Sequence, residues 1–134
     1  MSEHDVRALR ANYAGNVTLI DDQIGALIEA VRLRGEYDDT LVIFTSDHGE
    51  MNGDHGLIYK GNFLDPSFKV PLIVKPPGTA PRNPSATASM REQLVELMDA
   101  GATILDYAGA APIGHGKSLA SVVANPDAAY RTTI

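Results

Sequence analysis

Residues 40–60 read TLVIFTSDHGEMNGDHGLIYK, and this stretch decides the predicted fold. Residues 41–44 form a continuous apolar run rich in β-formers, which is typical of a strand covered on both faces, as in a parallel sheet flanked by helices. The polar residues that follow the run would lie at the carboxyl end of this strand, where α/β sheets place their binding crevice. The stretch therefore predicts a buried strand that delivers ligands to one end of a sheet.

The polar residues after this strand have the chemistry of a metal and anion site. Asp47 offers a hard carboxylate and His48 an imidazole, and Gly49 is expected to turn the backbone so that both side chains reach one cation. His55 can return to the same site, and Lys60 adds a mobile positive charge suited to a phosphate-like or sulfate-like dianion. The alternative is a plain strand-to-loop turn with both histidines solvated.

These residues resemble the late signature of the sulfatase family of the alkaline phosphatase superfamily. That signature runs from a strand into Ser-Asp-(His or Asn)-Gly-Glu, then Gly-Asp-His-Gly, then Gly-Lys. Residues 46–50 read SDHGE, residues 53–56 read GDHG, and Tyr59 precedes Lys60, so a tyrosine replaces the family's glycine. The resemblance extends over about residues 10–120, through segments at 13–16, 21–25, 70–74, 103–109 and 116–119.

The resemblance implies roles for single residues. Asp47 and His48 match two ligands of the family's single divalent cation, expected to be calcium, with magnesium or manganese as alternatives. Lys60 matches a lysine that contacts substrate oxygens, and His55 is a further candidate contact. Histidine at position 48 is closer to the choline-sulfatase and phosphonate monoester hydrolase branch than to vertebrate-type arylsulfatases.

The family's early nucleophile motif, Cys- or Ser-x-Pro-x-Arg, is absent from these 134 residues, which contain no cysteine. The resemblance therefore implies a formylglycine nucleophile in a missing N-terminal part. We expect an arylsulfatase-like sulfuric ester hydrolase, acting on a small anionic sulfate ester, of which this chain is an inactive piece. The alternatives are a phosphonate monoester or phosphodiester hydrolase fragment, or a non-catalytic fragment that needs a partner chain.

The implied fold is α/β, a partial alkaline-phosphatase-like three-layer α/β/α sandwich with a mostly parallel sheet. Residues 1–134 are expected to form a single partial domain, with a flexible loop at about 76–89 that contains four prolines. An incomplete sheet leaves unpaired edges, so a homo-oligomer formed through these edges is a further expectation.

Composition narrows the classes of partner. The formal net charge is −6 and the eleven Lys and Arg residues are scattered, so neither nucleic acid nor an anionic membrane surface is an expected partner. The chain has no N-terminal apolar segment and no run of about 18 apolar residues. The prediction is a cytoplasmic protein, with a signal peptide on a missing N-terminal part left open.

Periodicity and capping residues predict the remaining elements. A helix is expected over about residues 5–34, either continuous or broken near Gly15. Gly35 is expected to cap its C-terminus, and Asp21 and Asp22 are expected on its solvated face. A second strand is expected at 70–74 and a last helix at 118–124. Between them, a helix begins either near residue 89 or only at Asp99, and Lys117 is expected to be an ordinary surface residue.

Overall fold

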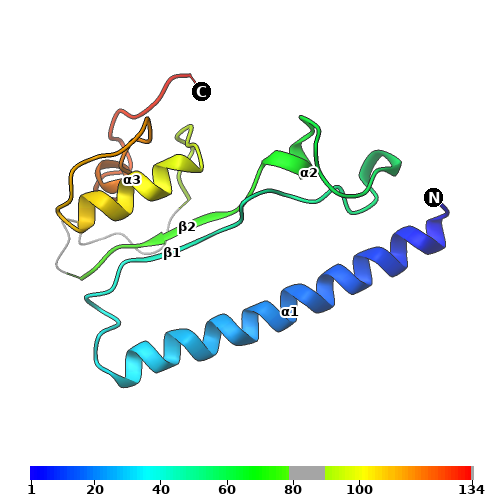
Figure 1. The fold of residues 1–134 in the computed structure, drawn as a ribbon, viewed down its shortest axis with the longest axis horizontal. Helices are drawn as coiled ribbons and strands as arrows, with labels where there is room; N and C mark the ends of the chain where they lie inside the picture. Colours follow the sequence, from blue (N-terminus) through cyan, green and yellow to red (C-terminus); the bar gives the residue numbers. More distant parts are fainter. Residues whose placement is uncertain (79–89, 134) are drawn as a thin grey trace. The chain divides into compact units, whose positions relative to one another are not determined.

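A computed structural model describes residues 1–78 and 90–133 of the chain (Figure 1). Residues 79–89, most of the expected flexible loop, lie outside the described residues. The described elements are α1 (Glu3–Leu33), β1 (Val42–Thr45), the 3-10 helix η1 (Asp54–Gly56), α2 (Asp65–Phe68), β2 (Leu72–Lys75), α3 (Met98–Tyr107) and α4 (Ala120–Ala124).

The described residues fall into two compact units. Unit 1 comprises Met1–Tyr37 and Phe44–Leu72, and unit 2 comprises Asp38–Ile43 and the described part of Ile73–Ile134. Each strand of the sheet has residues in both units. The single partial domain expected from the sequence stays a prediction.

Helix α1 is defined by caps at both ends. The Ser2 hydroxyl accepts a hydrogen bond from the Asp5 backbone N–H at 3.2 Å, and the Asp5 carboxylate accepts one from the Ser2 N–H at 2.9 Å, which completes a capping box. At the other end Gly35 has a φ of 73° and the Glu36 N–H donates to the Val31 carbonyl, as in a Schellman motif. The predicted helix and its glycine cap are confirmed, and the helix continues through position 15.

Helix α1 buries none of its residues within this structure, and Asp21 and Asp22 are exposed as expected. Among the residues described, no helix combines the length and the apolar content that are needed to cross a membrane.

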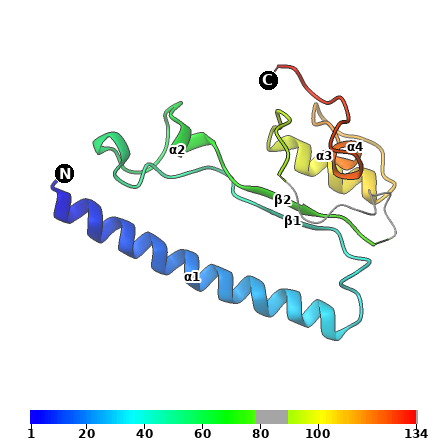
Figure 2. The same ribbon diagram turned by 180° about the vertical axis from the view of Figure 1, so that it is seen from behind.

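Strands β1 and β2 form a two-stranded sheet, and their arrows run in opposite directions (Figures 1 and 2). The mostly parallel sheet is therefore not what residues 1–78 and 90–133 form. The connection between the strands doubles back, whereas a parallel pair needs a crossover that returns the chain to the starting edge. The strand is also less covered than predicted, since no residue of β1 is fully buried and Phe44 is 37% exposed.

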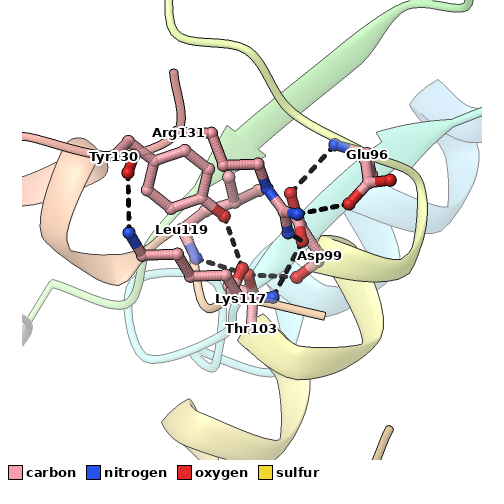
Figure 3. A network of polar contacts seen from close by, with 7 residues as sticks. All are labelled: Glu96, Asp99, Thr103, Lys117, Leu119, Tyr130 and Arg131. Atoms are coloured by element: carbon pink, nitrogen blue, oxygen red, sulfur yellow. Dashed lines mark hydrogen bonds and ion pairs between the residues drawn. The ribbon is translucent and has the colours of Figure 1, made fainter. Parts of the chain in front are cut away.

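Unit 2 is organised by the start of α3, which packs against α4. Asp99 is completely buried, and its carboxylate accepts hydrogen bonds from the backbone N–H groups of Glu96 at 2.9 Å and Lys117 at 2.8 Å (Figure 3). Thr103, also buried, accepts from the Leu119 N–H at 2.9 Å through its hydroxyl. The helix therefore begins next to Asp99 rather than near residue 89, because the aspartate is engaged with loop donors on both sides.

The C-terminal segment closes this network. The Arg131 guanidinium forms ion pairs with both Asp99 and Glu96, which lie more than 30 residues away in the chain. The Tyr130 hydroxyl donates to the Lys117 carbonyl at 2.5 Å, while the Lys117 amine donates to the Tyr130 carbonyl at 2.9 Å and lies 4.6 Å from the ring centroid (Figure 3). Lys117 is exposed, as predicted for a surface residue, and its contacts with Tyr130 add a structural role that the sequence did not indicate.

Tyr130 should make the folded state sensitive to alkali. Burial, followed by the nearby negative charge of Asp99, raises the pKa of Tyr130 to about 12 from the ordinary value of 10.0, against the opposing charge of Arg131. A raised folded-state pKa stabilises the fold fully below the unfolded pKa, and that stabilisation is lost as the pH rises through the folded value. We expect the free energy of unfolding to fall as the pH rises from 10.0 to about 12.

Urea unfolding across this pH range, with tyrosine ionisation followed by ultraviolet absorbance, measures the effect. Tyr130→Phe should remove most of the alkaline loss. Tyr13→Phe, at an exposed ring on α1, is the matched control and should leave the loss in place. Identical pH profiles for the unchanged chain and Tyr130→Phe would contradict the prediction.

Candidate functional site

The candidate site lies in the segment that follows β1, residues 46–61, which we call the site loop. Asp47 is two residues beyond the end of β1, and the whole loop belongs to unit 1. Gly49 anchors it: its N–H donates to the Ser67 carbonyl at 2.7 Å, and a side chain at Gly49 would collide with the Pro66 carbonyl group, whose carbon would lie 2.9 Å from the added Cβ. Gly49 has no positive φ, so a close backbone approach, and not the expected sharp turn, requires glycine here.

The hydrogen bonds of His48 determine which ring nitrogen carries a proton. Its Nδ1 lies 2.8 Å from the Gly49 carbonyl oxygen, and its Nε2 lies 2.6 Å from the Lys60 amine. A carbonyl oxygen only accepts and an ammonium group only donates, so the neutral ring carries its proton on Nδ1 and offers the lone pair of Nε2. That nitrogen has the form in which histidine ligates a metal.

Asp47 and His48 present two electron-pair donors to the same point. The Asp47 Oδ2 lies 3.4 Å from His48 Nε2. Two such donors are held together favourably only by a positive charge, which Lys60 provides at His48 and which a divalent cation would provide for both. The two side chains therefore fit two positions of a coordination sphere.

The same two side chains do not make a complete metal site. Hard divalent cations take about six donors, and within the described part of the chain there is no group of three His, Cys, Asp or Glu residues that could hold a metal ion. The Asp47 side chain is 82% exposed and that of His48 is 40% exposed. The arrangement is an open half-site.

The structure brings the Lys60 amine to His48. His55 is an exposed residue inside η1, with a φ of 55°. It forms no group of three with Asp47 and His48 that could hold a metal. The predicted role of His55 as a contact in the site stays a prediction.

Residues of α1 contact the site loop within unit 1. The sequence analysis did not predict this contact. The Arg10 guanidinium donates to the Asn52 carbonyl at 3.2 Å and pairs with the Asp54 carboxylate at 2.6 Å. Val6 packs so closely over Gly53 that a Cβ at the glycine would lie 2.9 Å from a Val6 methyl group. The glycine at position 53 was the one sequence signal for this contact.

Tyr59 has a φ of 65°, in the left-handed region that favours glycine. This is the position where the resembled signature carries glycine before its lysine. The backbone thus keeps the conformation of a glycine while the side chain is that of a tyrosine, 69% exposed.

Comparison with known proteins decides the family, since the sulfatase family model matches residues 2–110. The chain belongs to the sulfatase family. The matched range includes the complete site loop, and the resemblance predicted from residues 46–60 is confirmed.

Three relatives illustrate the range of the family around this sulfatase chain. It is 40% identical over 109 residues to the multifunctional alkaline phosphatase superfamily protein PehA of Trinickia caryophylli, covering 81% of this chain and 20% of that one. It is 42% identical over 81 residues to the choline-sulfatase of Rhizobium meliloti, covering 60% of this chain and 16% of that one. The crystal structure of the phosphonate monoester hydrolase of Agrobacterium radiobacter superposes with a TM-score of 0.81 at 37% identity, covering 91% of this chain and 24% of that one.

This sulfatase chain thus spans about a fifth of the length of the curated relatives it matches. Its fold is that of the corresponding part of a solved sulfatase-type structure. A sheet of two strands and a half-site with two ligands are what a chain of about a fifth of the relatives' length would contain.

Proposed function

We propose that this chain is the part of a metal-dependent, arylsulfatase-like sulfuric ester hydrolase that carries two metal ligands, Asp47 and His48, and an anion-contacting lysine, Lys60. The observation that supports the proposal is the convergence of three groups, with His48 Nε2 lying 3.4 Å from the Asp47 carboxylate and 2.6 Å from the Lys60 amine. The cation we propose is calcium, with magnesium or manganese as alternatives.

Each residue of the half-site has a separate task in this proposal. The Gly49 carbonyl holds the His48 ring with the protonated Nδ1 toward it, which leaves the Nε2 lone pair free for a ligand at 3.4 Å from the Asp47 carboxylate. A bound cation would supply positive charge that stabilises the anionic ester as further negative charge develops in the transition state. Lys60 provides a second positive charge on a flexible stem, and its three N–H donors match the oxygens of a tetrahedral anion.

The remaining parts of the proposed enzyme come from outside residues 1–134. These are the nucleophile, expected to be formylglycine, the other metal ligands, and the strands that would place β1 in a mostly parallel α/β/α sandwich. The isolated chain is proposed to be inactive for this reason.

A phosphonate monoester or phosphodiester is the second candidate substrate. It is favoured by the similarity to a phosphonate monoester hydrolase at a TM-score of 0.81. Sulfate and phosphoryl centres are both tetrahedral and anionic, so Asp47, His48 and Lys60 serve either one.

A non-catalytic role, as a fragment that acts only with a partner chain, is favoured by a different observation. Large apolar side chains are widely exposed among the described residues, including Phe63 at 97%, Leu33 at 80% and Ile113 at 76%. Surfaces of this kind usually meet another protein surface.

Manganese titration followed by paramagnetic broadening of NMR signals tests the proposed ligands on this chain alone. We expect broadening centred on Asp47 and His48 with an apparent Kd of about 1 mM, because two donors bind a hard cation weakly. Asp47→Asn should abolish the broadening at His48. Asp65→Asn, at an exposed carboxylate of α2 in the same unit, should not change it.

Three outcomes would contradict parts of the proposal. Broadening confined to other carboxylates would exclude Asp47 and His48 as ligands. Micromolar affinity for calcium, magnesium or manganese in calorimetry would show a complete site instead of a half-site. Turnover of an aryl sulfate by the pure chain, abolished in Asp47→Ala, would show that the chain is catalytic by itself.

A further inference from the structure

The site loop contains an unusual density of left-handed backbone. Three residues other than glycine have a positive φ within eight positions: Asn52 at 48°, His55 at 55° and Tyr59 at 65°. Such backbone is sterically unfavourable for residues that carry a side chain, and it persists only where the surrounding structure enforces it. Contacts within the loop are therefore needed to hold the backbone of Asn52 and Tyr59 in the left-handed conformation.

Glu50 is the group that contacts both. One carboxylate oxygen of Glu50 accepts a hydrogen bond from the Asn52 N–H at 3.1 Å and another from the Tyr59 N–H at 2.5 Å. The two donors are seven residues apart in the chain. Hydrogen bonds from backbone N–H groups to a carboxylate are among the stronger ones in proteins.

The neighbouring Met51 also contacts Tyr59. Its N–H donates to the Tyr59 carbonyl at 2.9 Å, so both backbone groups of Tyr59 are bonded to consecutive residues at the start of the loop. The Met51 side chain is completely buried and forms the local core of the loop. The conformation of Tyr59 is thus defined from both sides.

The contacts of Tyr59 with Glu50 and Met51 affect the candidate site, because Tyr59 directly precedes Lys60 in the chain. The amine of Lys60 lies 2.6 Å from His48 Nε2, and His48 is two residues before Glu50. The φ of Tyr59 sets the direction in which the chain continues into Lys60. A change from left-handed to ordinary backbone at Tyr59 would turn the lysine away from His48.

We propose that Glu50 is a positioning residue of the site: its carboxylate holds Tyr59 in the left-handed conformation and so places the Lys60 amine at His48. The contact between Lys60 and His48 stands on the geometry alone. Its importance for catalysis rests on the proposed function of Lys60 as an anion contact.

The test measures the contact directly in the isotope-labelled chain, by nuclear Overhauser effects between the Lys60 side chain and the His48 ring and by the Cα shift of Tyr59. In Glu50→Ala we expect the cross-peak to disappear and the Tyr59 shift to leave the left-handed range. In Glu50→Gln, whose carbonyl oxygen still accepts both hydrogen bonds, we expect both signals to remain. Glu3→Ala, at an exposed carboxylate paired with Arg7 in α1, is the matched control.

Two substitutions at Tyr59 keep the proposal testable if Glu50→Ala fails to fold. Glycine adopts a positive φ without strain, so Tyr59→Gly should keep the cross-peak. Valine is strongly disfavoured at positive φ, so Tyr59→Val should lose it while Glu50 is still present. Persistence of the cross-peak in folded Glu50→Ala, or in folded Tyr59→Val, would overturn the proposal.

Titration with inorganic sulfate separates this inference from the proposed function. The proposed function predicts that sulfate perturbs the Lys60 signals in the unchanged chain. Absence of that perturbation would contradict the anion-contacting role of Lys60, whereas the effect of Glu50 on the cross-peak would still establish the positioning role.

Discussion

Replacing Asp99 by alanine should lower the free energy of unfolding of unit 2 by about 4 kcal/mol. The carboxylate is fully buried and accepts from the Glu96 and Lys117 N–H groups, and it pairs with Arg131. Alanine would leave two backbone donors unsatisfied and a guanidinium, only 18% exposed, with Glu96 as its remaining ion-pair partner. Urea unfolding near neutral pH measures the loss.

An exposed carboxylate provides the control for this prediction. Asp65 pairs with Lys69 at 2.6 Å, but both side chains are about two-thirds exposed. Asp65→Ala should therefore change the free energy of unfolding by no more than about 0.5 kcal/mol. Equal effects of the two substitutions would contradict a central role for the buried Asp99.

The pH dependence separates the charge of Asp99 from the cavity that alanine leaves. Burial by itself would raise the pKa of this carboxyl, but the Glu96 and Lys117 N–H donors, Tyr130 and the charge of Arg131 together lower it below the ordinary value of 3.8. A lowered folded-state pKa stabilises the fold above the unfolded pKa, and that stabilisation is lost as the pH falls through the folded value. The stability difference between the unchanged chain and Asp99→Ala should therefore shrink as the pH falls below 3.8.

Replacing Gly49 by alanine should destabilise unit 1 by about 3 kcal/mol. The added methyl group would meet the carbonyl carbons of Pro66 and Ser67 at 2.9 Å and 3.1 Å, with the Pro66 oxygen closer still, and none of these atoms can move without shifting the backbone. The hydrogen bond of 2.7 Å from the Gly49 N–H to the Ser67 carbonyl would lengthen as a result. Because the Gly49 carbonyl orients His48, the ring would lose its orientation as well.

Gly25 offers a matched control with the opposite sign. It lies in the interior of α1, and nothing is within 4 Å of a Cβ built there. Gly25→Ala should stabilise the chain by about 0.5–1 kcal/mol, because alanine loses less backbone freedom on folding. Urea unfolding of both variants, with the His48 ring signals observed by NMR, checks the two predictions together. A loss at Gly49→Ala below about 1 kcal/mol would show that the loop relaxes to accept a side chain.

Local signals in the sequence were sufficient for several elements of the fold. The Gly35 cap and the helical spacing of apolar residues predicted a helix over about residues 5–34, and α1 spans Glu3–Leu33. The apolar run that ends before Ser46 predicted β1 to within one residue. These features depend on groups that are close in the chain, such as cap donors and side chains one turn apart, so the pattern of residues contains the necessary information.

The direction of the sheet could not be obtained in the same way. An apolar run is typical of a strand in a covered sheet but contains no statement about the direction of its neighbour. The neighbour of β1 among the described residues is β2, which the chain reaches by doubling back through the site loop and α2. The prediction of a parallel sheet came from the apolar run as well as from the family resemblance, and the described residues form an antiparallel pair instead.

What the sequence by itself determined is the family and the identity of the candidate ligands, because SDHGE, GDHG and the following lysine form a contiguous pattern that is readable without a structure. The tertiary structure alone decided which of these residues meet: Lys60 reaches His48, His55 does not form a metal-holding group with Asp47 and His48, and Glu50 connects the two ends of the loop. It also decided that Arg131 neutralises Asp99 across 32 residues. The physical reason is that these long-range contacts depend on a few backbone angles and on close approaches between backbone segments. Residues that are distant in the chain determine those angles and approaches together.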